Sequence, residues 1–226
     1  MIPLRDDNPT RTWPVVTVAL IVLCSLVFLW QLSLSTNGQQ QAAYLFGFIP
    51  AVVFGNAQLE GQWIPAGATI ITSMFLHGGW LHLIGNMLYL WIFGDNIEDR
   101  LGRGRFVAFY LLCGAVAALG QGLADARSEV PMIGASGAIS GVLGAYVVLY
   151  PRAKVLVLVP LLIFITTVRV PALVVLGIWF AGQLLSSLAA APGSGGGVAF
   201  AAHVGGFVAG VVLIRLFLLG RRRPRR

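Results

Sequence analysis

Six apolar runs, most of them about 20 residues long, constrain this chain more than any other feature of its sequence. A hydrocarbon core of about 30 Å needs roughly 20 apolar residues per crossing helix. With 58% hydrophobic and only 10% charged residues among 226, the chain carries too much apolar surface for a water-soluble domain of its size. The sequence therefore predicts an all-α polytopic membrane protein with six transmembrane helices, at 15–34, 80–93, 106–124, 133–150, 171–188 and 200–219.

The first run, 15–34, follows Arg5 and Arg11, as the apolar part of a signal peptide would. A signal peptide's apolar region usually has about 7–15 residues, whereas this run has about 20. We therefore interpret it as a retained first helix.

Basic residues decide between six crossings and seven, because cytoplasmic loops are enriched in Lys and Arg near helix ends. Six crossings place both termini in the cytoplasm and leave only Arg127, of 15 basic residues, on the outer side. A seventh helix at 155–168 would move either Arg152 and Lys154, or Arg169 and the tail, to the outer side. The stretch 155–168 is therefore predicted to be a loop along the cytoplasmic interface.

The resulting organisation is a cytoplasmic N-terminal segment (1–12), a six-helix membrane domain (13–219) and a basic cytoplasmic tail (220–226). The formal net charge is +7, and five of the 15 basic residues lie in the tail. Their place directly after an apolar run indicates contact with an anionic lipid bilayer, not with nucleic acid. The outer segment 35–69 carries one charge and several aromatic residues, so we expect it to fold into the outer interface.

The three histidines, His77, His82 and His203, are functional candidates, because imidazoles are rare in membrane helices. His82 and Asn86 are four residues apart, so both side chains lie on one helical face. His203 shares a face with two glycines of the sixth run, which would let another helix approach closely. The alternative for each histidine is a structural hydrogen bond between helices.

Ser136 lies in Gly-Ala-Ser-Gly (134–137), at the outer end of the fourth run. Alone, this motif more often marks close helix packing than a nucleophile. However, a rise of about 1.5 Å per residue places Ser136, His203 and His82 about 21, 24 and 20 Å above the cytoplasmic boundary. Their common depth favours a single site.

The residue types of that site suit acyl transfer. A serine hydroxyl needs a nearby base, and His203 can supply one. The oxyanion of the tetrahedral intermediate needs donors, which His82, Asn86 and the Ser136 backbone N–H could provide. The acidic residues are predicted to lie in tails and loops, so we expect a Ser–His dyad without an orienting carboxylate. No His-Glu-x-x-His motif is present, and no metal or cofactor is expected.

Taken jointly and in order, three motifs resemble those of the rhomboid family of intramembrane serine proteases. They are His-x-x-x-Asn in the second run (His82, Asn86), Gly-x-Ser-Gly in the fourth (Gly134, Ser136, Gly137), and Ala-His-x-x-Gly-x-x-x-Gly in the sixth (Ala202, His203, Gly206, Gly210). The resemblance extends to 94–102, which looks like a structural turn of the family containing Glu98.

The resemblance implies that Ser136 is the nucleophile and His203 the general base, while His82 and Asn86 help to bind the oxyanion. It also implies a structural role for Glu98 at the cytoplasmic face. One departure is Ser140, since some family members carry at this position a tyrosine that stacks against the catalytic histidine. Catalytically dead relatives lose the serine or the histidine, and this chain keeps both.

The implied activity is hydrolysis of single-span membrane proteins in or near their transmembrane segments, in a multi-pass protein of the cell membrane, of the bacterial plasma membrane type. Trp179 and Phe180 are candidate gate residues, although contact with lipid explains them equally well. The rival interpretation is a non-catalytic scaffold or a small transporter, in which the glycines pack helices and the histidines line a path. It predicts a function independent of Ser136.

Overall fold

The computed structural model describes residues 2–161, 164–189 and 199–219, and most of them are helical. The predicted tail, 220–226, lies outside the described residues. The long helices are α1 (Val15–Ser33), α5 (Trp80–Leu101), α6 (Arg103–Ala124), α7 (Ser136–Leu149), α8 (Ala172–Ala189) and α9 (Phe200–Phe217). Each of them overlaps one of the six predicted runs.

Among the described residues, α1, α6 and α9 are long and apolar enough to cross a membrane. Helix α7 and the first part of α8 are shorter apolar helices, while α5 carries several charges at its end. The protein is thus a mostly helical, multi-pass membrane protein, and six crossings with cytoplasmic termini remain a prediction.

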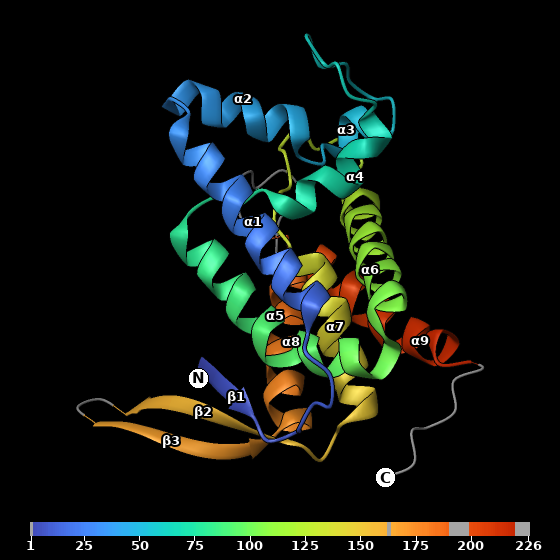
Figure 1. Ribbon diagram of the computed structural model, residues 1–226. Coiled ribbons are helices and arrows are strands. Elements are labelled where there is room, and N and C mark those ends of the chain that lie inside the picture. The colour runs from blue at the N-terminus through green and yellow to red at the C-terminus, as the bar shows by residue number, and fades with distance from the viewer. Residues whose placement is uncertain (1, 162–163, 190–198, 220–226) are drawn as a thin grey trace.

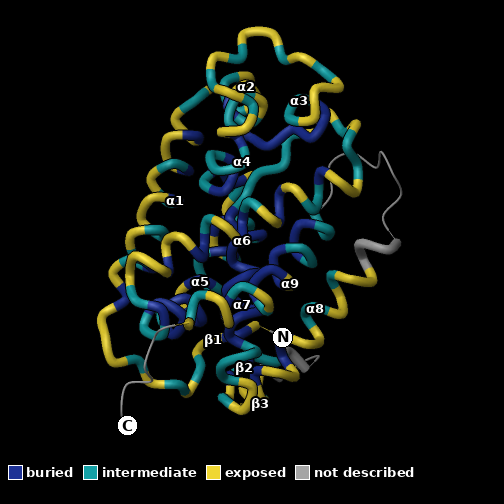
Figure 2. The backbone as a smooth tube through the Cα atoms, turned by 90° about the vertical axis from the view of Figure 1, so that its right-hand side faces the viewer, coloured by how far each residue is buried: buried dark blue, intermediate teal, exposed yellow. Residues whose placement is uncertain are grey.

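Helix α7 is the centre of the bundle, and all of its residues from 137 to 146 are buried. Helices α5, α6 and α9 pack around it, whereas α1 and α8 lie at the outside with long exposed stretches (Figure 2). Apolar side chains such as Leu26 on α1 and Ile178 on α8 are more than half exposed, as suits contact with hydrocarbon. Cys24 and Cys113 are buried and unpaired.

Helix α5 is longer than predicted, because it continues for two turns beyond Phe93 and ends at Gly102, whose φ is +77°. The expected turn at 94–102 is therefore mostly helix. Glu98 is a helix residue and not a loop residue, and its side chain is buried (2% exposed). Its carboxylate accepts hydrogen bonds from the backbone N–H groups of Val16 (2.9 Å) and Thr17 (2.7 Å). Glu98 thus caps the first turn of α1, where an anion also complements the helix dipole.

The expectation of a purely α-helical chain is wrong at the end of the molecule where the N-terminus lies. Strands β1 (Ile2–Asp6), β2 (Lys154–Leu161) and β3 (Phe164–Pro171) form an antiparallel sheet in the order β1-β2-β3 (Figure 1). The described residues of the predicted loop at 155–168 thus lie in β2 and β3 and form no helix. The stretch is rich in Val, Ile and Thr, whose branched Cβ atoms favour strands.

The N-terminal segment is fixed to helix α7 by Asp6 and to strand β2 by Asp7. The Tyr146 hydroxyl, near the end of α7, donates a hydrogen bond to the Asp6 carboxylate at 2.5 Å. Asp7 accepts one from the backbone N–H of Lys154 at 2.7 Å. Burial raises the pKa of the Asp6 carboxyl above its usual value of 3.8.

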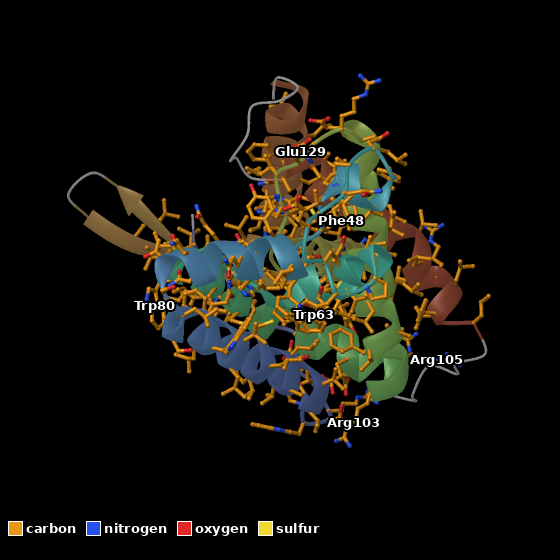
Figure 3. The ribbon with its side chains drawn as sticks, turned by 90° about the horizontal axis from the view of Figure 1, so that it is seen from above. Phe48, Trp63, Trp80, Arg103, Arg105 and Glu129 are labelled. Atoms are coloured by element: carbon orange, nitrogen blue, oxygen red, sulfur yellow. The ribbon has the colours of Figure 1, made fainter. Side chains whose placement is uncertain are left out.

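The long segment after α1 is folded over the opposite end of the bundle (Figure 1). It contains α2 (Thr36–Phe46), α3 (Pro50–Val53), η1 (Ala66–Ala68), α4 (Thr69–Thr72) and η2 (Ser73–Phe75). The Phe46 ring lies 5.8 Å from that of Trp30 and 5.7 Å from that of Trp63, edge to face in both cases. Trp30 lies on α1, so the Phe46–Trp30 contact joins this segment to the bundle. Figure 3 shows Phe48 and Trp63 in a view from above.

Candidate active site

The structure brings Ser136 and His203 together, although 67 residues separate them in the sequence. Ser136 is the first residue of α7, and His203 lies in the first turn of α9. The distance from Ser136 Oγ to His203 Nε2 is 2.8 Å, and His203 is only 7% exposed. A hydroxyl hydrogen-bonded to a buried imidazole is the arrangement that a serine nucleophile and its general base require.

Glycines allow the backbones of α7 and α9 to touch at this point. A Cβ atom added to Gly206 or Gly210 would fall far inside the contact distance of the carbonyl oxygens of Gly137 and Gly141. The glycines of α9 thus face the glycines of α7, and their contact sets the distance between the two helices that carry Ser136 and His203.

His82 and Asn86 lie beside the segment that leads into α7. Gly134, with φ +124°, packs against them: an added Cβ would lie 2.6 Å from His82 Nε2 and 3.8 Å from Asn86 Nδ2. His82 Nδ1 accepts a hydrogen bond from the backbone N–H of Gly78 at 3.3 Å. In a neutral imidazole the proton is then on Nε2, the atom that faces Gly134.

Asn86 Nδ2 is buried and has no acceptor in the described part of the chain. A buried amide donor without a partner is costly. Together with His82 Nε2–H and the backbone N–H at the start of α7, it forms a group of donors around residues 134–136. Such a group can stabilise an anion that develops next to Ser136.

His77, the third histidine, packs against the ring of His82. Its ring centroid is 5.2 Å from that of His82, and its backbone N–H donates to the Gln31 side chain at 3.0 Å. The Nδ1 atom of His77 lies 3.3 Å from the Phe75 carbonyl oxygen.

Helix α8 contributes two contacts to His203, one of which the sequence analysis missed. The Gln183 Oε1 atom lies 2.6 Å from His203 Nδ1. The Trp179 ring lies 5.9 Å from the His203 ring at an interplanar angle of 38°. A polar residue in an apolar run, one helical turn after Trp179, was the signal available in the sequence.

These contacts also bear on Ser140, the departure from the family pattern. Ser140 is fully buried, and its hydroxyl donates to the Ser136 carbonyl oxygen at 2.6 Å. The aromatic contact with His203 comes instead from Trp179 on α8. Phe180 stacks on Phe207 with ring centroids 4.4 Å apart, so both candidate gate residues pack against α9.

No group of three or more His, Cys, Asp or Glu residues that could hold a metal ion is found in ranges 2–161, 164–189 and 199–219.

Comparison with known proteins gives one family match, to the Rhomboid domain over residues 63–220. The chain is 33% identical over 160 residues to "Rhomboid protein 1, mitochondrial" of Saccharomyces cerevisiae, covering 68% of this chain and 43% of the yeast protein. It is 35% identical over 148 residues to "Presenilin-associated rhomboid-like protein A, mitochondrial" of Danio rerio, covering 63% and 35% of the two chains.

A bacterial relative is "Rhomboid protease GluP" of Bacillus subtilis, 39% identical over 95 residues, or 41% of this chain and 17% of GluP. In all three comparisons the matched region spans less than half of the relative's length.

Proposed function

The chain belongs to the rhomboid family, and we propose that it is an intramembrane serine protease that cleaves single-span membrane proteins in or near their transmembrane segments. The observation that carries the proposal is the 2.8 Å hydrogen bond between Ser136 Oγ and His203 Nε2, and the buried, unpartnered amide of Asn86 supports it. The match to a relative named as a rhomboid protease supports the same activity.

In the proposed reaction, His203 Nε2 accepts the hydroxyl proton while Ser136 Oγ attacks the substrate carbonyl carbon. The oxyanion accepts hydrogen bonds from the Ser136 backbone N–H, His82 Nε2–H and Asn86 Nδ2–H. The protonated His203 then gives its proton to the leaving amine. Water, deprotonated by the same imidazole, hydrolyses the acyl-enzyme and releases Ser136.

The substrate has to lose its helical structure locally before this reaction, because peptide bonds inside a helix are shielded. Residues that weaken a helix, glycine above all, lower that cost, so we expect them near the cleavage site. The proposed reaction uses no metal or cofactor.

We also propose six crossings with both termini in the cytoplasm, in a plasma membrane of bacterial type. The distribution of basic residues supports this orientation, because it leaves only Arg127 outside. The site then lies on the outer side of the bilayer, as the predicted depths of Ser136 and His203 require.

The experiment compares wild type, Ser136→Ala, His203→Ala and the double variant in proteoliposomes, with a panel of single-span substrates. The two single losses and the double loss should be similar in size, because nucleophile and base act as a unit. Ser33→Ala is the control, since Ser33 is exposed on α1 and bonds only the Trp30 carbonyl among the described contacts. Substantial cleavage by folded Ser136→Ala would refute Ser136 as the nucleophile, whereas no cleavage by folded wild type would favour a non-catalytic function.

A further inference from the structure

The contact between α8 and His203 is made through an amide where soluble serine proteases use a carboxylate. Gln183 Oε1 is an acceptor only, so at 2.6 Å it requires His203 Nδ1 to carry the ring proton. A neutral imidazole has one N–H, and Nε2 is then left with its lone pair. That lone pair faces the Ser136 hydroxyl at 2.8 Å.

The opposite tautomer would disable the site. With the proton on Nε2, His203 could only donate toward Ser136, and it could not accept the hydroxyl proton during attack. In the described structure, Gln183 and the Ser136 hydroxyl are the two hydrogen-bond partners of the ring. The preference between tautomers therefore depends on Gln183.

An uncharged partner also fits the place of the site in the membrane. A carboxylate at membrane depth is costly, whereas an amide carbonyl orients the ring without a net charge. Trp179, four residues before Gln183 and on the same face of α8, contacts the ring as well. Neighbours at 184 and 185 are exposed, so Gln183 is turned inward while the next residues face outward.

We propose that Gln183 is a positioning residue for His203, which fixes the Nδ1–H tautomer and directs Nε2 to Ser136. This inference rests on the proposed function of the Ser136–His203 pair. It adds α8 to the elements that build the site, because Gln183 on α8 would orient His203 on α9, which faces Ser136 on α7.

The kinetic test uses Gln183→Met, which keeps the length of the side chain but removes the carbonyl acceptor, and Gln183→Glu, which keeps an acceptor oxygen. Gln183→Met should lower kcat by about 10- to 100-fold, as when the partner that orients a functional histidine is lost, and leave KM within about twofold. Gln183→Glu should recover most of the loss. Gln40→Met is the matched control, because Gln40 is exposed on α2.

A spectroscopic test needs no substrate. Nitrogen-15 NMR of histidine-labelled protein reports which ring nitrogen is protonated, and the sequence has only three histidines. His203, assigned by the signal lost in His203→Ala, should be protonated on Nδ1 in wild type and a mixture of tautomers in Gln183→Met. If Gln183→Met does not fold, Gln183→Ala takes its place in both tests.

The two proposals fail separately. Cleavage by Ser136→Ala would refute Ser136 as the nucleophile of the proposed function, whereas the tautomer measurement would still test the role of Gln183. Wild-type kcat in Gln183→Met, or an unchanged His203 tautomer in that variant, would overturn the inference on Gln183 and leave the Ser136–His203 assignment intact.

Discussion

The substitution Gly206→Ala tests whether contact between the backbones of α7 and α9 sets the geometry of the site. A Cβ added at Gly206 would lie 2.1 Å from the Gly137 carbonyl oxygen, and real Cβ atoms essentially never come closer than 3.0 Å to another heavy atom. The two helices must therefore separate by about 1 Å at this level, one turn from His203.

A shift of that size along the Ser136–His203 direction would lengthen the 2.8 Å hydrogen bond beyond the usual limit. A misplacement of about 1 Å can cost about 10²-fold in rate. Overpacking of this kind also destabilises a protein by about 1–3 kcal/mol. We expect Gly206→Ala to remain folded, with a lower unfolding temperature and a rate reduced by about two orders of magnitude.

The assay is the rate of covalent labelling by a fluorescent fluorophosphonate, which needs an activated serine but no substrate, together with thermal unfolding in detergent. Gly205→Ala is the matched control, because an added Cβ there would have its nearest neighbours at 3.7 Å, an ordinary contact distance. Gly205→Ala should label at a rate close to wild type. Labelling of Gly206→Ala at the wild-type rate would refute the reasoning.

Three further predictions concern the donors, the N-terminal segment and the topology. Asn86→Ala should lower kcat by up to about 10²–10³-fold with little change in KM, and a change in KM alone would move Asn86 to the substrate-binding cleft. Because burial raises the pKa of Asp6 above 3.8, folding favours its protonated form, and this contribution to stability is lost as pH rises through the raised pKa. The unfolding temperature of wild type relative to Asp6→Asn should therefore fall from about pH 4 toward neutrality, and a constant difference would contradict this. In a background without Cys24 and Cys113, an impermeant maleimide added to intact cells should label cysteine at exposed position 60 but not at exposed position 152, and the reverse would invert the protein in the membrane.

Much of the fold could be predicted because local signals mark the helix ends. Helix α1 begins directly after Pro14, α8 begins after Pro171, and α5 stops at a glycine with positive φ. The end of α5 was misplaced because its last two turns carry charges. Glu98 is kept in the helix by its hydrogen bonds to α1, a tertiary contact that hydropathy does not report.

The sheet and the contact of Gln183 with His203 both depend on packing between distant segments of the chain. The stretch 155–168 was predicted as a loop, since charge counts decide only whether a segment crosses the membrane. Pairing of β2 with the distant strand β1 is a non-local contact. The approach of Gln183 to His203 depends on how α8 packs beside α9, and the sequence of neither helix alone determines that packing. The glycines at 206 and 210, in contrast, predict close helix packing by their four-residue spacing.

The most direct test of the central claim is the site of covalent labelling by a fluorophosphonate in the folded wild-type protein, located by peptide mass spectrometry. The account predicts one modified residue, Ser136, and strongly reduced labelling in folded His203→Ala, because the hydroxyl is activated through the 2.8 Å hydrogen bond. Modification at another serine, or labelling of His203→Ala at the wild-type rate, would contradict it.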